Sequence, residues 1–430
     1  MAFEPVDAVE VRIWGERVGA LVLDPGIGYY VFEYSPGWSE RGIELAPIHM
    51  PTATALHVYP TLPEITFRRL PAMIADSLPD DFGNAIVNAA LAREGIPAAS
   101  ITPLDRLAYL GQRGTGALEY HPMRGPRSRK ATAIELSELV VAARSAVAGR
   151  LDGDAGAEVA LSELIAVGTS AGGARAKAVV AWNPVTKELR SGQADAPPGF
   201  EQWLLKLDGV GADLELGGTQ DYGRIEYGYH RMARAAGITM TDCHLLEENG
   251  RAHFMTRRFD RDNGEKVHLQ TLCAMAHLDF RLLATHDYAQ YLQTIDLLGL
   301  GGEARAEGFR RMVFNVYAAN CDDHTKNLSF AMGEHGSWGL SPAYDVTHAH
   351  NPRGAWTSTH QMAVNGKFDQ ISRGDLAEVA DRYNVPGWKG VVAQVVDAVD
   401  RWPEFAAEAG LRAETARLIE QDMADLAPRL

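Results

Sequence analysis

Residues 320–327 read Asn-Cys-Asp-Asp-His-Thr-Lys-Asn, and residues 341–345 read Ser-Pro-Ala-Tyr-Asp. Two strand-like runs lie between these motifs, at 327–332 and 338–340, and the sequence Gly-Glu-His-Gly-Ser joins them. Strand-like runs on both sides of a short turn that contains glycine are typical of a β-hairpin. We therefore expect the chain to fold back on itself between the two motifs.

The fold-back places polar side chains of both motifs at one end of the hairpin. If the turn is centred near His335, residue 327 pairs with about residue 343 in an antiparallel register. Asp322, Asn327 and Asp345 then lie close together. Carboxylate and carboxamide oxygens suit Mg²⁺, and a further carboxylate can accept a proton from a hydroxyl group. The sequence thus predicts a magnesium site beside a general base.

The same spacing occurs in protein kinases. There, an Asp stands five positions before an Asn, and a metal-binding Asp follows after a hairpin. Here five positions separate Asp322 from Asn327, and Asp345 takes the place of the later carboxylate. The alternative is that these residues only shape turns, in which Asp and Asn are common. Companion features elsewhere in the chain favour the kinase interpretation.

The first companion is the stretch 168–177, Gly-Thr-Ser-Ala-Gly-Gly-Ala-Arg-Ala-Lys, which precedes a strand-like run at 178–182. Small residues let backbone N–H groups approach phosphates closely, so Gly172 and Gly173 are candidate nucleotide-binding residues. The stretch matches neither GxxxxGK[ST] nor GxGxxG. A flexible turn is the alternative.

The second companion is a lysine in a predicted strand. Trp203, Leu205 and Leu207 alternate onto one face, so Lys206 points to the other. Such a lysine usually lies at a sheet edge or extends its ammonium group into solvent. In kinases a strand Lys holds the α- and β-phosphates and pairs with a helix Glu. Glu226 is the candidate partner, and a solvated helix Glu is the alternative.

The third companion is a strand-like run at 253–259 that leads into Asp260 and Arg261. It lies between a strand-rich and a helical region, where hinge backbone groups of a kinase would contact adenine.

Composition excludes several classes of protein. The net charge is −15, from 41 Lys and Arg against 56 Asp and Glu, which argues against broad nucleic-acid binding by this chain alone. No apolar run approaches the roughly 18 residues of a membrane span. Three cysteines without a CxxC motif exclude a disulfide scaffold. The first residues do not resemble a signal peptide, so we expect a cytoplasmic protein.

Changes in pattern along the chain suggest three parts. Residues 1–125 combine alternating strand patterns with helical spacing, and a basic linker follows at 123–132. Residues 133–265 are strand-rich and carry the glycine-rich stretch and the strand Lys, whereas 266–430 are mostly helical and carry the catalytic and metal-binding motifs. The expected fold class is α+β: a small N-terminal α/β domain, then a two-lobed protein-kinase-like fold with a strand-rich lobe and a helical lobe.

Taken together, these motifs resemble the HipA family of bacterial toxin kinases. The resemblance spans nearly the whole chain, from a HipA-type N-terminal domain to the kinase motifs. It rests on the glycine-rich stretch, Lys206, Arg-Phe-Asp-Arg at 258–261, the motifs at 320–327 and 341–345, Leu-Pro-Asp-Asp at 78–81 and Gly-Thr-Gly-Ala-Leu at 114–118.

The resemblance implies an ATP- and Mg²⁺-dependent serine/threonine protein kinase that acts as the toxin of a toxin–antitoxin pair. Characterised members phosphorylate aminoacyl-tRNA synthetases, which halts translation and slows growth. A small helix-turn-helix antitoxin, HipB, neutralises the toxin, and the complex binds operator DNA. We therefore expect a HipB-type partner, a protein substrate and DNA contact only through the antitoxin.

The resemblance also implies roles for individual residues. Asp322 would be the catalytic base, and Asn327 and Asp345 the Mg²⁺ ligands. Lys206 would bind phosphate, and residues 257–259, with Arg257 and Phe259, would form the adenine hinge. We further expect Lys326 to help neutralise the transferred phosphoryl group.

Family members also autophosphorylate a Ser of the glycine-rich loop. That Ser corresponds here to Ser170, with Thr169 as the alternative. Phosphate there would place negative charge where ATP phosphates bind and would switch the enzyme off. The loop departs from the common family pattern, because Arg175-Ala176 stands where Gln-Glu usually precedes the Lys.

Two other functions fit parts of the sequence. A metal-dependent phosphohydrolase could use the carboxylates and imidazoles of Asp322, Asp323, His324, Asp345, His348 and His350. That interpretation leaves Lys206 and the glycine-rich stretch unexplained. A non-catalytic co-repressor acting through a DNA-binding partner is the second alternative, which the complete set of kinase residues argues against.

Overall fold

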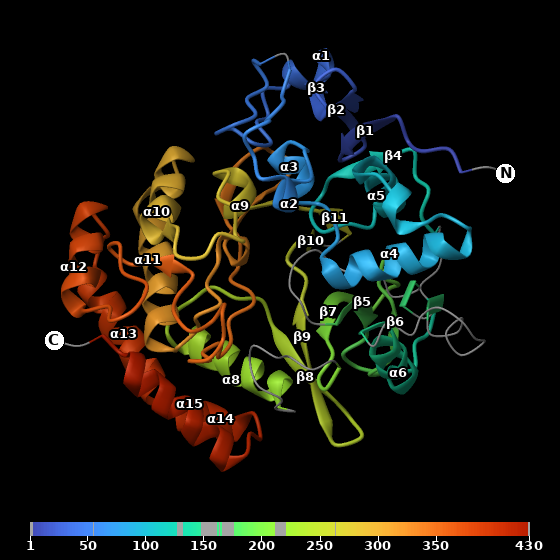
Figure 1. Cartoon of the computed structure of the whole chain (residues 1–430). Coiled ribbons are helices and arrows are strands. Elements are labelled where there is room, and N and C mark those ends of the chain that lie inside the picture. The colour runs from blue at the N-terminus through green and yellow to red at the C-terminus, as the bar shows by residue number, and fades with distance from the viewer. Residues whose placement is uncertain are drawn as a thin grey trace. The chain divides into compact units, whose positions relative to one another are not determined.

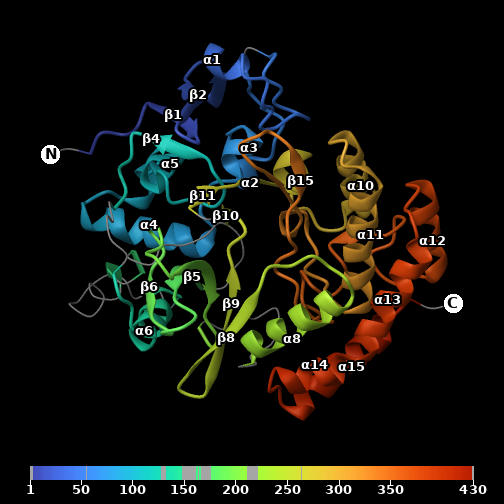
Figure 2. The same cartoon turned by 180° about the vertical axis from the view of Figure 1, so that it is seen from behind.

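The structure of the chain is a computed structural model, shown from two sides in Figures 1 and 2. It describes residues 3–54, 56–126, 132–147, 161–162, 164–165, 176–210, 221–262 and 264–428. The chain divides into two compact units. Unit 1 comprises Met1–Gly211, Met255–Gln270 and Ala331–Ser337, and unit 2 comprises Ala212–Phe254, Thr271–Phe330 and Trp338–Leu430.

Unit 1 begins with an antiparallel meander, where the sequence has its alternating strand patterns. Its strands are β1 (Ala8–Ile13), β2 (Glu16–Asp24) and β3 (Tyr29–Tyr34), and β4 (Glu119–His121) completes a sheet of order β3-β2-β1-β4. Alternate residues of β1, starting at Val9, are fully buried. The period-two pattern of apolar residues therefore sets which face of this sheet packs on the core.

The helices of unit 1 follow their capping residues. Helix α4 (Asp81–Arg93) begins where the Asp80 carboxylate accepts a hydrogen bond from Gly83 N at 2.7 Å. Helix α5 (Pro103–Leu110) has a complete capping box between Thr102 and Asp105. The remaining described helices are α1 (Pro36–Ser39), α2 (Glu64–Phe67), α3 (Ala72–Ala75), the 3₁₀ turn Ala98–Ser100 and α6 (Leu136–Val147).

A second sheet of unit 1 is built on β5 (Lys177–Trp182), whose six residues are all buried. It pairs antiparallel with β6 (Leu189–Ser191) and β7 (Glu201–Lys206). The end of β9 (Arg251–Arg257) lies beside β7, where Arg258 N donates to Gln202 O at 2.9 Å. Short strands β10 (Arg261–Asp262), β11 (Glu265–Lys266) and β12 (His268–Thr271) follow.

Unit 2 is mostly helical. Its long helix α11 (Gly301–Tyr317) packs against α10 (Tyr288–Leu297) and α13 (Trp388–Asp400), and α8 (Tyr222–Ala235) packs against α14 (Trp402–Glu408) (Figures 1 and 2). Its other described elements are β8 (Cys243–Glu248), α9 (Leu272–Met275), β13 (His286–Asp287), the 3₁₀ turn Thr325–Asn327, β15 (Trp338–Leu340), β16 (Met362–Ala363), α12 (Arg373–Arg382) and α15 (Ala413–Leu426). Strand β14 (Ser329–Met332) begins in unit 2, and its last two residues belong to unit 1. No helix in the described part of the chain is both long and apolar enough to cross a bilayer.

A buried carboxylate joins two of the sequence motifs within unit 1. Asp260 accepts hydrogen bonds from both Arg258 and Arg261, at 2.6 to 2.8 Å, and from Gly116 N at 2.8 Å. Gly116 has a φ of +79°, and a Cβ there would lie 3.2 Å from Leu269 N, so glycine suits this turn. The motifs at 114–118 and 258–261 thus form one structural junction.

We predict that Asp260→Asn destabilises unit 1 by about 3–5 kcal/mol, because it leaves two buried guanidinium groups without their anion. Burial alone would raise the pKa of Asp260, but Arg258 and Arg261 outweigh it and hold that pKa below its ordinary value. The stabilisation is therefore present at neutral pH and is lost as the pH falls below about 4. Urea unfolding at pH 7 and at lower pH measures both effects, and an Asp260→Asn variant with native stability at pH 7 would contradict the prediction.

Candidate active site

The predicted hairpin is present, and the residues at its open end, 327–330 and 338–345, belong to unit 2. Ser341 N donates to Ser329 O at 3.0 Å, which is the register in which residue 327 lies opposite residue 343. The Tyr344 hydroxyl donates to Lys326 O at 2.7 Å and also contacts the Ser329 hydroxyl. The expected fold-back is therefore confirmed, and Tyr344 fixes its open end.

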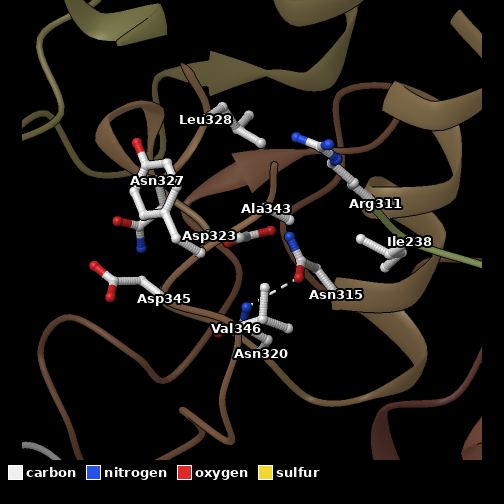
Figure 3. Close-up of a pocket in the computed structure, with 11 residues that line it drawn as sticks. Ile238, Arg311, Asn315, Asn320, Asp323, Asn327, Leu328, Ala343, Asp345 and Val346 are labelled. Carbon is white, nitrogen blue, oxygen red and sulfur yellow. Dashed lines mark hydrogen bonds between the residues drawn. The ribbon is translucent and has the colours of Figure 1, made fainter. Parts of the chain in front are cut away.

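The hairpin brings together the polar residues expected there. Asn327 Nδ2 donates to Asp322 O at 2.7 Å, and Asn327 and Asp345 line one pocket. The Asn327 amide and the Asp345 carboxylate lie on the same side of that pocket, opposite Arg311 and Ile238 (Figure 3). Asp345 also acts electrostatically on Asp322.

The backbone at Asp345 is in an unusual conformation. Its φ is +52°, in the left-handed region that non-glycine residues rarely adopt. Such a conformation costs on the order of 1–3 kcal/mol and persists where the surroundings impose it, often at functional sites. Here the neighbouring residues are fixed, since Tyr344 is bound to the hairpin and Ala343 N donates to Thr239 O at 2.8 Å.

The Asp322 carboxylate is held on one side and open on the other. Its Oδ1 accepts a hydrogen bond from Trp356 Nε1 at 2.8 Å and lies 3.8 Å from His324 Nε2, while 41% of the side chain remains exposed. Burial raises the pKa of Asp322. His324 and the Trp356 hydrogen bond oppose that shift, and Asp345 and Asp323 add to it. A carboxylate whose pKa lies above its ordinary value is a better proton acceptor once ionised.

The next residue, Asp323, is in the opposite situation. It is buried, and its carboxylate accepts hydrogen bonds from the Tyr288 hydroxyl at 2.9 Å and from Gln361 N at 2.7 Å. His360 Nδ1 lies 3.0 Å from the same carboxylate. These partners occupy both carboxylate oxygens. Sequence analysis missed Trp356, His360 and Gln361 as partners of the 320–327 motif, since no local pattern links positions so far apart.

Asn327 and Asp345 fit a magnesium ion. The amide nitrogen of Asn327 is used by Asp322 O, which leaves the amide oxygen as a ligand beside the Asp345 carboxylate. Mg²⁺ is typically bound by one or two carboxylates, with waters and substrate phosphates as further ligands. Within the described residues, no three His, Cys, Asp or Glu side chains are arranged to hold a metal ion.

Several side chains that could bind the metal ion of a phosphohydrolase make other contacts instead. His348 Nε2 lies 2.8 Å and His350 Nδ1 3.3 Å from the Asp422 carboxylate on α15. Asp323 is occupied by Tyr288 and Gln361. The structure therefore favours a positioning role for these side chains over metal ligation.

The proposed lysine and glutamate lie in different units. Lys206 is the last residue of β7 in unit 1 and is half-buried. Glu226 is on α8 in unit 2 and is only 4% exposed, so the alternative of a solvated helix Glu is wrong. Burial and, secondarily, Glu226 raise the pKa of the neighbouring Cys243 to about 12. The pairing of Lys206 with Glu226 stays a prediction.

Four predicted loop residues, Thr169, Ser170, Gly172 and Gly173, lie outside the described residues. The description resumes at Ala176, and the next side chain, Lys177, lies with its Nζ 3.5 Å from Asp80 Oδ2. Both side chains are buried, and burial raises the pKa of Asp80 to about 6 although Lys177 opposes it. An ion pair thus joins the Leu-Pro-Asp-Asp motif to the start of β5.

The remaining candidates have defined positions. Arg257 ends β9, and Phe259 follows it, half-buried, before the Asp260 junction. Lys326 lies with its Nζ 5.0 Å from the centre of the Phe280 ring, a distance typical of a cation–π contact. None of these positions by itself tests the hinge or phosphate roles.

Comparison with known proteins identifies the family. The HipA-like C-terminal domain matches residues 169–429, and the HipA N-terminal domain matches residues 9–121. The protein therefore has the two-part domain composition of a HipA-type chain. The chain belongs to the HipA family.

A solved structure shares the fold over nearly the whole chain. HipA from the complex of the Shewanella oneidensis MR-1 toxin–antitoxin proteins HipA and HipB with operator DNA is 16% identical, with a TM-score of 0.67. The match covers 97% of this chain and 96% of that one, so the expected α+β fold of the family is confirmed. The Helicobacter pylori proinflammatory kinase CtkA is 10% identical, with a TM-score of 0.35 over 60% of this chain and 90% of that one. A search among curated proteins found no match.

We predict that the two adjacent carboxylates respond differently to the same substitution. Asp323→Asn is expected to lower the free energy of unfolding by about 1–3 kcal/mol, because an amide N–H would face buried donors. Asp322→Asn, at a half-exposed side chain, is expected to change it by less than about 1 kcal/mol. Chemical denaturation of both variants measures the difference, and equal losses would show that Asp322 is also a structural residue.

Proposed function

We propose that the protein is an ATP-dependent serine/threonine protein kinase and the toxin of a toxin–antitoxin pair. The observation that carries this proposal is the convergence of Asp322, Asn327 and Asp345 at one end of a hairpin, with kinase spacing, in a chain of the HipA family. The half-exposed Asp322 carboxylate and the constrained backbone of Asp345 support a reactive site rather than a group of turn residues.

The proposed mechanism assigns each residue one task. Asp322 accepts the proton of the attacking hydroxyl group, while Asn327 and Asp345 hold the metal ion. A bound Mg²⁺ ion would neutralise negative charge on the ATP phosphates. Lys206, Gly172 and Gly173 would contact those phosphates, with Glu226 orienting the lysine. Positioning and charge neutralisation would account for most of the rate enhancement.

Lys326 and the hinge residues complete the proposed site. Lys326 projects from the 320–327 motif, beside the Phe280 ring, and would neutralise charge on the transferred phosphoryl group. Arg257 ends the strand β9, Phe259 follows it, and both would lie at the adenine hinge. Autophosphorylation at Ser170 would place negative charge in the ATP phosphate site and inhibit the enzyme.

We propose a helix-turn-helix antitoxin of the HipB type as the partner. The Shewanella structure contains HipA, HipB and operator DNA together. The net charge of −15 argues that this chain would reach DNA only through such a DNA-binding partner. An aminoacyl-tRNA synthetase is the proposed protein substrate, and the cytoplasm the proposed location.

We predict that incubation of the purified protein with labelled ATP, Mg²⁺ and cell lysate transfers phosphate to a protein. Asp322→Asn and Asp345→Asn should lower the rate about a hundredfold or more, because each removes a group required in the transition state. Asp381→Asn on the exposed face of α12 makes the same chemical change away from the site and should retain activity. Mass spectrometry identifies the target and distinguishes Ser170 from Thr169. Native transfer rates in Asp322→Asn and Asp345→Asn would contradict the proposal.

A further inference from the structure

The segment that follows Asp345 returns to the candidate base. Trp356 lies between Asp345 and β16, and its indole N–H donates to Asp322 Oδ1 at 2.8 Å across 34 positions of the chain. An ionised carboxylate has about four acceptor sites on two oxygens. A donor on Oδ1 therefore fixes the orientation of the group and leaves acceptor sites for a second donor.

Trp356 is itself anchored to the residue next to Asp322. The Gln361 side-chain amide donates to Trp356 O, and Gln361 N donates to Asp323 Oδ1 at 2.7 Å. His360 Nδ1 lies 3.0 Å from the other oxygen of the same carboxylate. The two consecutive carboxylates therefore hold the segment 356–361 at both of its ends.

A chain of ring contacts reaches the indole that carries this donor. The rings of His324 and Trp356 lie 6.2 Å apart in an edge arrangement, and the rings of Phe280 and His324 lie 5.4 Å apart. Edge contacts of this kind stabilise the orientation of an aromatic side chain. The contact with His324 therefore helps to hold the indole with its N–H toward Asp322.

The exposed fraction of the Asp322 side chain shows whether Trp356 blocks this carboxylate or only positions it. An indole that closed the site would cover the carboxylate, whereas 41% of the Asp322 side chain remains exposed. The contact leaves room for a hydroxyl group to approach. Trp356 therefore holds the Asp322 carboxylate without covering the side that a substrate hydroxyl group would approach.

We propose that Trp356 is a positioning residue for the catalytic base: its indole N–H holds Asp322 Oδ1 so that Oδ2 faces the acceptor hydroxyl. This inference rests on the proposed kinase function. The residue does not touch substrate in this role. It acts on the rate of phosphoryl transfer through the orientation of Asp322, and ATP affinity is independent of it.

Two substitutions separate the donor from the ring. Trp356→Phe keeps an aromatic ring and removes the N–H, whereas Trp356→His places its Nε2 at the same distance along the side chain as the indole Nε1 but removes the second ring. The assay is incorporation of labelled phosphate into the chain itself from ATP and Mg²⁺. Trp356→Phe should lower the maximal rate about tenfold, the typical effect of one hydrogen bond to a charged group, with the half-saturating ATP concentration unchanged. Trp356→His should recover most of that loss.

Controls make the outcome decisive. Trp388→Phe, at the start of α13, makes the same substitution outside the site and should retain the native rate. Gln361→Met removes the amide that holds Trp356 O and should lower the maximal rate in the same direction, which tests the idea with Trp356 intact. Thermal unfolding of each variant establishes that it is folded.

The possible results distinguish the two proposals. Phosphate incorporation by the native chain with a native rate in Trp356→Phe would overturn the role of Trp356 and leave the kinase function standing. Equal losses in folded Trp356→Phe and Trp356→His would also overturn it, because ring volume rather than the donor would then matter. Absence of phosphate transfer in the native chain, to itself and to lysate proteins, would instead overturn the proposed function.

Discussion

The register of the hairpin β14–β15 is the constraint on which the candidate site depends. The register decides which residues lie opposite each other beyond the ends of the two strands, so a slip by one residue would displace Asp345 relative to Asn327. The Ser329–Ser341 backbone hydrogen bond and the Tyr344 hydroxyl on Lys326 O fix the register at the open end of the hairpin. This anchoring also holds the left-handed backbone of Asp345, because its neighbours on the N-terminal side cannot move to relieve the strain.

Sequence analysis predicted the parts of this arrangement that depend on local pattern. A turn that contains glycine between two short strand-like runs sets the hairpin register, and the register alone places Asp345 near Asn327. Glu226 lies at the edge of an apolar stripe whose period fits α8, a position from which a side chain can face the core or the solvent, and the structure buries it. Both patterns rely on periodicities of two or 3.6 residues, which are visible in a single sequence.

The contacts that sequence analysis missed join distant positions. The hydrogen bonds from Trp356 to Asp322, from Gln361 to Asp323 and from Gly116 to Asp260 are made between residues 34, 38 and 144 positions apart. Nothing in the local composition distinguishes a partner at such a separation from any other polar residue. The sequence Arg-Phe-Asp-Arg at 258–261 could be recognised as a motif. Its contact with residues 114–118 could not be derived from the sequence, because the two segments are so far apart in the chain.

Asp322 and Asp323 show how tertiary contacts separate the roles of two identical side chains. Both oxygens of Asp323 accept hydrogen bonds from buried partners, so this carboxylate serves to hold the segment 356–361 in place. Asp322 receives one donor from that same segment and keeps an exposed side. Asp323 holds the segment 356–361, and this segment in turn orients Asp322. The stability that Asp323 provides and the orientation of Asp322 are therefore linked through Trp356 and Gln361. A change that loosens the segment would therefore disturb the proposed base even when Asp322 itself is intact.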